Sequence, residues 1–216
     1  MEPPFETLGT FPAGKPFWSG PALGADHPDV AVTLTYLGTV LRRCGKPARA
    51  RQVLERALEI NTTTYGLQDP RLAVTLAHLG HTLRELGDLT QARAAHESAL
   101  AIRRSVYPEQ HPEVAFAFRD LGRTLRDVGD LAGARSHIER ALGIFEAAYG
   151  PMHPETATSL DHLAIVLRDQ GDLDGARSLH ERALTIREAG LGGDHPDTAR
   201  SRERLAAVVR ELANRE

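Results

Sequence analysis

The sequence has little cysteine, little aromatic content and no long apolar run. Its single cysteine, Cys44, excludes an intrachain disulfide and any zinc site built on several cysteines. Aromatic residues make up only 5% of the 216 residues, and the apolar content is mostly Ala and Leu, which favours helices over strands. No apolar run approaches the roughly 18 residues of a membrane span. The first residues lack the basic and apolar regions of a signal peptide. We therefore expect a soluble, cytoplasmic chain with no membrane partner.

Lysine is also scarce, and the overall charge is nearly balanced. Lys15 and Lys46 are the only lysines among the 26 basic residues, so nearly every cation is an arginine. The 29 acidic residues leave a formal net charge of -3, which gives no general attraction to nucleic acid. A guanidinium is planar and permanently charged, and it suits carboxylate or phosphate partners.

A repeat of 42 residues organises nearly the whole chain. Each unit opens with a dipeptide that ends in proline: His27-Pro28, Asp69-Pro70, His111-Pro112, His153-Pro154 and His195-Pro196. The same spacing links the leucines Leu37, Leu79, Leu121, Leu163 and Leu205, and the glycines Gly45, Gly87, Gly129 and Gly171. A fixed period of this length indicates a repeat array. Its units are residues 27–68, 69–110, 111–152 and 153–194, followed by a terminal part at 195–216.

Each unit has the pattern of two helices. The proline of the opening dipeptide is typical of the first position of a helix, and the preceding histidine is expected to serve the turn and the cap. Gly87 and its equivalents are typical of a helix end, and Asp88, Asp130 and Asp172 of the cap of a second helix. Gly80 and its equivalents predict a close approach of the two helices. No segment of residues 26–216 shows the alternation of a strand.

The repeat resembles a known family. Leu79-Gly80, Leu83, Ala92 and Ala99, with a terminal proline, resemble the tetratricopeptide repeat (TPR), and the 42-residue unit opened by His-Pro resembles its kinesin-light-chain-type subclass. The resemblance covers residues 27–216. It implies an all-α fold, an α-solenoid of antiparallel helix pairs in a right-handed superhelix, with four repeats and a C-terminal capping helix. Residues 26–216 would form this domain, and the Pro/Gly-rich residues 1–25 are expected to be disordered.

The sequence shows no catalytic motif. It contains no phosphate-binding loop, no nucleophile elbow and no H-E-x-x-H pair. We therefore expect no catalytic residue, no cofactor and no metal site. His96 and His180 fall on the buried face of second helices and are interpreted as core residues. His78 and His81, one turn apart, could join Asp120 as a metal-binding set, but we favour the simpler interpretation of two groove histidines.

The resemblance also implies where a ligand would bind. In the TPR superhelix the first helix of each unit lines the concave face, where extended peptides bind. Exposed positions there lie two before, one before, two after and five after each leucine of the Leu37 set. The candidate groove residues are Arg42, Arg43, His78, His81, Arg84, Arg119, Arg123, Arg126, His162 and Arg168.

These arginines allow two interpretations. They form a cationic surface for acidic side chains, a C-terminal carboxylate or a phosphate, or some of them clamp their own turn. Arg84, Arg126 and Arg168 each stand four residues before an aspartate, which favours the clamp. Arg42, Arg43, Arg119 and Arg123 have no such built-in partner. A second series, Arg51, Arg93, Arg135 and Arg177, precedes Glu by four residues and predicts solvated intrahelical ion pairs.

The function that these features favour is a non-catalytic scaffold that binds a peptide or partner protein of acidic character in the concave groove. An alternative, implied by the resemblance, is a ligand-sensing repeat arm derived from a larger nucleotide-binding signalling ATPase. Nucleic-acid binding along the arginines is a third hypothesis, disfavoured by the net charge and by the lack of interleaved aromatics. The sequence does not indicate an oligomeric state.

Overall fold

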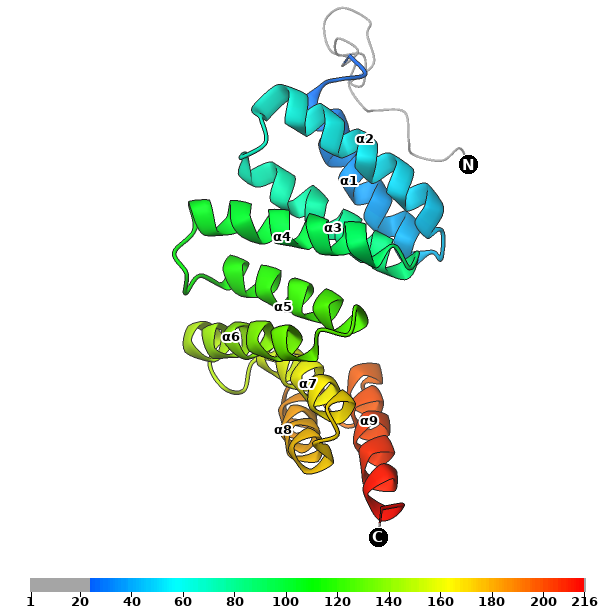
Figure 1. Ribbon diagram of the computed structural model, residues 1–216, viewed down its shortest axis with the longest axis vertical. Helices are drawn as coiled ribbons and strands as arrows, with labels where there is room; N and C mark the ends of the chain where they lie inside the picture. The colour runs from blue at the N-terminus through cyan, green and yellow to red at the C-terminus, as the bar shows by residue number, and fades with distance from the viewer. Residues whose placement is uncertain (1–23, 216) are drawn as a thin grey trace, which may run out of the picture.

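The computed structural model describes residues 24–215, and this part of the chain consists of nine α-helices and no strand (Figure 1). The helices are α1 (Pro28–Arg43), α2 (Pro47–Tyr65), α3 (Pro70–Glu85), α4 (Leu89–Val106), α5 (Pro112–Asp127), α6 (Leu131–Tyr149), α7 (Pro154–Asp169), α8 (Leu173–Leu191) and α9 (Pro196–Ala213). The all-α expectation is confirmed. The disorder expected for residues 1–25 concerns a segment that lies, up to residue 23, outside the described residues.

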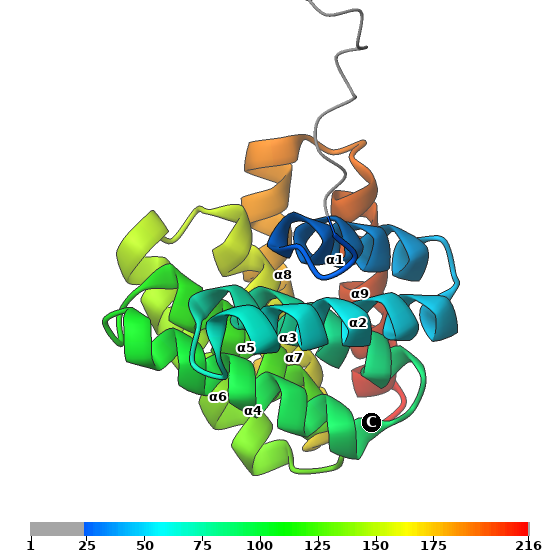
Figure 2. The same ribbon diagram turned by 90° about the horizontal axis from the view of Figure 1, so that it is seen from above.

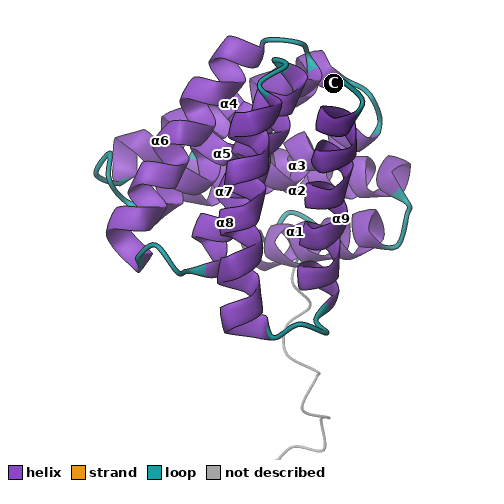
Figure 3. Cartoon of the chain, turned by 90° about the horizontal axis from the view of Figure 1, so that it is seen from below, coloured by secondary structure: helices purple, strands orange, loops and turns teal. Residues whose placement is uncertain are grey.

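The helix pairs follow one another along the long axis of the molecule, from α1 to α9 (Figure 1). Helices within a pair pack together, and the second helix of each pair packs on the first helix of the next. First helices of neighbouring pairs also touch, as α1 on α3, α3 on α5 and α5 on α7, whereas second helices make no comparable contact in the described part. Elements on the inside of a curved stack lie closer together, so the first helices line the inner face. Figure 2 shows this stack from one end, and the helix pairs with their short loops are visible in Figure 3. The architecture is an α-solenoid.

The opening dipeptides cap the first helices as the sequence predicts. Each first helix has its proline in the first turn. The Nδ1 atom of the preceding histidine accepts a hydrogen bond from the backbone N–H two residues on, at 3.1 Å from His27, His153 and His195 and at 3.2 Å from His111. Asp69 makes the same contact through its carboxylate, at 2.9 Å. A short acceptor side chain at this position satisfies a backbone donor that the helix itself leaves free.

The second helices are capped by the predicted aspartates. Asp88, Asp130 and Asp172 each accept a hydrogen bond from the backbone N–H three residues on. The glycine before each cap has a positive φ, +80° at Gly87, a conformation that side-chain-bearing residues rarely adopt. In the first unit Lys46 takes the place of the aspartate, and α2 has no side-chain cap.

Glycines in the first helices admit the second helices closely. A Cβ atom at Gly38 would lie 2.5 Å from the Leu54 side chain, and one at Gly122 would lie 2.7 Å from the Ile138 side chain. His96 occupies the corresponding place against Gly80. Because these distances are below van der Waals contact, only glycine fits without a shift, and the predicted role of these positions is confirmed. The largest core cluster lies in the third unit, around Phe118 and Phe145.

The outer face of α1 is open. Leu37 and Val40 are 43% and 56% exposed, whereas Leu163 and Val166, their equivalents in the fourth unit, are 6% and 0% exposed. The reason is that no helix precedes α1 within the described residues. No helix in this range combines the length and apolar content of a membrane span.

Candidate functional site: the inner groove

Arginines at the ends of the first helices join each unit to the next. Arg42 contacts Glu85 at 2.5 Å, Arg84 contacts Asp127 at 2.8 Å, Arg126 contacts Asp169 at 2.5 Å, and Arg168 contacts Glu211 at 2.8 Å. We call Arg42, Arg84, Arg126 and Arg168 the arginine ladder. In each case the acid lies 43 residues further along the chain, so the ion pair crosses from one first helix to the next.

The ladder corrects the prediction made for these arginines. Arg84, Arg126 and Arg168 do not clamp the aspartate of their own turn, because that aspartate caps the following helix. Arg42, expected to lack a partner, is paired as well. The sequence does contain a signal for this arrangement: the ladder acids directly follow Arg84, Arg126, Arg168 and Arg210. Sequence reasoning missed it because the partner belongs to the neighbouring unit.

The two ends of the ladder differ from its interior. In the first unit Arg43 stands where later units carry the acid, and no first helix precedes it in the described residues. Within residues 24–215, Arg210, the last of the series, has neither a following unit nor an acidic partner. Within the part of the chain that the structure describes, no neighbouring repeat neutralises Arg43 or Arg210.

Arg119 was predicted as an exposed groove residue, and this prediction is wrong. Its exposed fraction is 9%, and its guanidinium contacts Glu155 of the next first helix at 2.5 Å. The same guanidinium lies 5.1 Å from the ring centroids of Phe116 and Phe145. The side chain is thus fixed between an acid and two aromatic rings, where it supports packing.

Arg123 lines the groove, and its guanidinium donates no hydrogen bond within the described residues. Its nearest acid in the described residues is Asp120, at 3.9 Å, and no hydrogen bond joins them. Burial lowers the pKa of Arg123, and the neighbouring Arg84 lowers it further. Arg123 lines a cavity of about 350 Å³ together with Arg42, His81, Arg84, Glu85 and Asp127. We call it the groove cavity. The cavity holds more cationic than acidic groups.

The groove histidines are half-buried. Nδ1 of His78 is buried and has no hydrogen-bond partner in the described part of the chain. His81 lies 3.4 Å from Asp120. Burial lowers the pKa of His162 well below its ordinary value, and the guanidinium groups of Arg123 and Arg119 add to this effect.

Asp161 lies two residues before Leu163, one of the positions predicted to be exposed in the groove, but it is 1% exposed. Its carboxylate accepts hydrogen bonds from His180 at 2.7 Å, Arg187 at 2.5 Å and Arg204 at 2.6 Å. These donors come from α8 and α9, so the carboxylate fastens three helices together. The core position predicted for His180 is confirmed. Two guanidinium groups around one carboxylate leave a local excess of positive charge.

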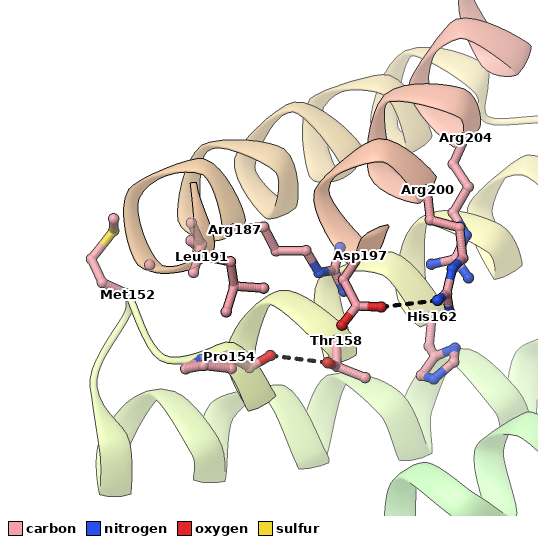
Figure 4. Close-up of a pocket in the computed structure, with 11 residues that line it drawn as sticks. Met152, Pro154, Thr158, His162, Arg187, Leu191, Asp197, Arg200 and Arg204 are labelled. Atoms are coloured by element: carbon pink, nitrogen blue, oxygen red, sulfur yellow. Dashed lines mark hydrogen bonds and ion pairs between the residues drawn. The ribbon is translucent and has the colours of Figure 1, made fainter. Parts of the chain in front are cut away.

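A second cavity, of about 230 Å³, adjoins this cluster between α7, α8 and α9 (Figure 4). Met152, Pro154 and Leu191 form one end of it, and His162, Arg200 and Arg204 lie at the other (Figure 4). Asp197 pairs with Arg200 at 3.1 Å. The cavity therefore offers an apolar wall beside a cationic one.

The second arginine series lies on the second helices, as the sequence predicts. The ion pairs Arg51–Glu55, Arg93–Glu97 and Arg135–Glu139 have distances of 2.7 Å, and Arg177–Glu181 has 2.8 Å. The side chains are about half exposed, so each pair contributes little to stability.

Comparison with protein families gives a match over nearly all of the described chain. A model of the tetratricopeptide repeat matches residues 71–147, 113–189 and 155–216, and a second model of the same description matches residues 30–71. The chain belongs to the tetratricopeptide repeat family. TPR folds generally mediate protein–protein interaction and are typically non-catalytic. A comparison with curated proteins gives no match.

Solved structures of TPR proteins share the fold. One is the crystal structure of kinesin-light-chain-like, nearly identical TPR-like repeats from Podosopora anserina, with a TM-score of 0.73 and 22% identity over 88% of this chain and 90% of that one. Another is BtubC (BKLC) from P. vanneervenii, with a TM-score of 0.73 and 23% identity over 86% of this chain and 74% of that one. The kinesin-light-chain-type resemblance is confirmed at the level of the fold.

Proposed function

We propose that this TPR chain is a non-catalytic scaffold that holds a peptide or a partner protein in its inner groove, and that the bound segment carries acidic side chains. The observation that carries the proposal is Arg123. Its guanidinium lines the groove cavity, lies close to other cations and donates no hydrogen bond within the described residues.

Arg123 has no carboxylate within hydrogen-bond distance in the described residues, since Asp120 lies 3.9 Å away. Burial and the charge of Arg84 both disfavour the protonated guanidinium, which appears as its lowered pKa. An incoming carboxylate would offset this penalty and accept two parallel hydrogen bonds, the geometry in which guanidinium pairs are strongest. The groove thus favours an acidic ligand at this point over a neutral one.

The cavity between α7, α8 and α9 supports a second contact. Its apolar wall at Met152 and Leu191 suits an apolar side chain, and its cationic wall at Arg200 and Arg204 suits a neighbouring acid. A peptide that carries both groups would use both walls. Apolar contact gives such a site affinity, and the charged groups fix the orientation.

The arginine ladder contributes to binding indirectly. Its members are engaged in ion pairs between repeats, so each holds two first helices in register. A groove that is already ordered loses less entropy when a ligand binds. We therefore assign the arginine ladder to positioning of the first helices. Arg123 and His162, which lie outside the ladder, are assigned to the ligand-facing surface.

The proposal is tested by affinity capture from the native host with identification by mass spectrometry. Wild type, Arg123→Glu and Arg135→Glu are compared, because Arg135 undergoes the same charge reversal on a second helix. We expect a set of partners that Arg135→Glu retains and Arg123→Glu loses, and that weakens as salt rises. Identical partner lists for all three proteins would contradict groove binding through Arg123.

A further inference from the structure

Three potential metal ligands converge from three successive helices. His81 comes from α3, His96 from α4 and Asp120 from α5, and each offers one ligand atom, all within 4.8 Å of one another. Nε2 of His81 lies 3.4 Å from Oδ2 of Asp120. The rings of His81 and His96 meet edge to face, with centroids 5.0 Å apart. Sequence reasoning considered His78 for this set; the structure places His96 there instead.

The hydrogen bonds around His96 determine which of its nitrogens is free. The hydroxyl of Thr124 donates to the backbone carbonyl of Asp120 at 3.1 Å, so its oxygen is available to accept from Nδ1 of His96 at 2.8 Å. Nδ1 then carries the proton and Nε2 keeps a lone pair. Nε2 is buried and has no hydrogen-bond partner in the described residues. A buried polar atom left in this way carries a desolvation cost that a ligand would relieve.

Comparison of the repeats shows that an unpartnered histidine nitrogen is unusual at this position. Leu54 and Ile138 occupy the corresponding positions of the first and third units and pack against the glycine opposite. His180 occupies it in the fourth unit, where Asp161 accepts a hydrogen bond from Nδ1 of the ring. His96 alone in this series combines a buried ring with an unpartnered nitrogen in the described residues.

We propose that His81, His96 and Asp120 bind a divalent transition-metal ion of the zinc type. Two imidazole nitrogens and one carboxylate oxygen are a ligand set that such ions accept, and three protein ligands leave a position open. The contact between Nδ1 of His96 and Thr124 would fix the ring as second-sphere contacts do at metal sites. His81 also lines the groove cavity, which gives the ion a path from solvent.

The charges around the site set its affinity. The Asp120 carboxylate supplies the negative charge of the proposed ligand set. A carboxyl group is ordinarily ionised at neutral pH, so it can bind an ion without first losing a proton. Arg123 lies 3.9 Å from the same carboxylate and competes with an ion for it. Removal of this positive charge is expected to strengthen metal binding.

The test is a titration of the untagged full chain with Zn²⁺ and Co²⁺, followed by equilibrium dialysis and, for Co²⁺, by visible absorption. We expect one ion per chain, and a loss of affinity of about tenfold or more in His81→Gln, His96→Leu and Asp120→Asn. His78→Gln, one turn away in the same groove, is the matched control and should bind as wild type does. Arg123→Gln should bind more tightly.

Several results would overturn the metal site. They are the absence of saturable binding by wild type, equal affinity in His81→Gln and wild type, or equal losses in His78→Gln and His81→Gln. His96→Leu introduces the residue that the first unit carries at this position, so the fold is expected to tolerate it. His81 is only half-buried, and His81→Gln keeps the test decisive if His96→Leu fails to fold.

Discussion

His162 lies in the groove within reach of arginines from two other first helices. Burial lowers the pKa of its imidazole well below the ordinary value, and Arg123, Arg119 and Arg204 lower it further, while Asp161 acts in the opposite direction. The folded protein therefore holds this ring neutral under conditions in which an unfolded chain would protonate it.

This difference predicts a pH dependence of stability. An unfolded histidine takes up its proton near pH 6.5, and the folded His162 takes it up only at lower pH. Between about pH 7 and pH 5 the unfolded state binds more protons, so the free energy of unfolding falls as pH falls. His162→Gln removes one contribution, and its stability should decline less steeply than that of wild type. Urea unfolding between about pH 5 and pH 7 measures the free energy of unfolding of wild type and of His162→Gln. Parallel dependences on pH would be evidence against a lowered pKa of His162.

Two glycines give opposite predictions for the same substitution. A Cβ at Gly122 would meet Ile138 at 2.7 Å and the carbonyl oxygen of Ala134 at 3.1 Å, whereas a Cβ at Gly143 meets nothing within 4 Å. We expect Gly122→Ala to lower the free energy of unfolding by about 1–3 kcal/mol through overpacking. Gly143→Ala, inside α6, should raise it by about 0.5–1 kcal/mol. Denaturant unfolding measures the free energy of unfolding of both variants against wild type. A change of the same sign in both would refute the close approach of the two helices at Gly122.

At the scale of the helix, the arginine ladder predicts coupling between neighbouring units. Arg84 and Asp127 are partly buried and belong to successive first helices, whereas Arg210 has no acidic partner in the described residues. A double-mutant cycle of Arg84→Gln and Asp127→Asn should give a coupling energy of about 0.5–1 kcal/mol. Arg210→Gln should change stability by less than about 0.5 kcal/mol. A coupling energy near zero would show that the ladder does not hold the repeats together.

The helices themselves follow closely from the sequence. Prolines and capping side chains mark the starts, and glycines at positive φ mark the ends of the first helices, because local backbone chemistry decides these points. The acidic partners of the arginine ladder could not be predicted from the sequence, although the chain repeats an arginine–acid dipeptide at its 42-residue spacing. Which acid an arginine reaches depends on how far one unit is rotated against the next, and that rotation is a property of the packing.

At the scale of the whole molecule, the solenoid converts a periodic sequence into one continuous inner surface. Sequence reasoning placed the candidate residues on this surface but overestimated their exposure, as Arg119 and Asp161 show with exposed fractions of 9% and 1%. Each is covered by side chains from later helices: Arg119 by Glu155 and Phe145, and Asp161 by Arg187 and Arg204. Contacts of this kind join residues that no local pattern connects.

The central claim is that the inner groove binds an acidic segment through Arg123. The most direct measurement is the dissociation constant of the captured partner peptide, obtained by fluorescence anisotropy at low salt for wild type, Arg123→Glu and Arg135→Glu. The account predicts a loss of at least about tenfold for Arg123→Glu, because a repulsive charge replaces a charge-assisted contact. Arg135→Glu should bind within about twofold of wild type. Equal affinities for all three proteins would contradict the claim and place the binding surface outside the groove cavity.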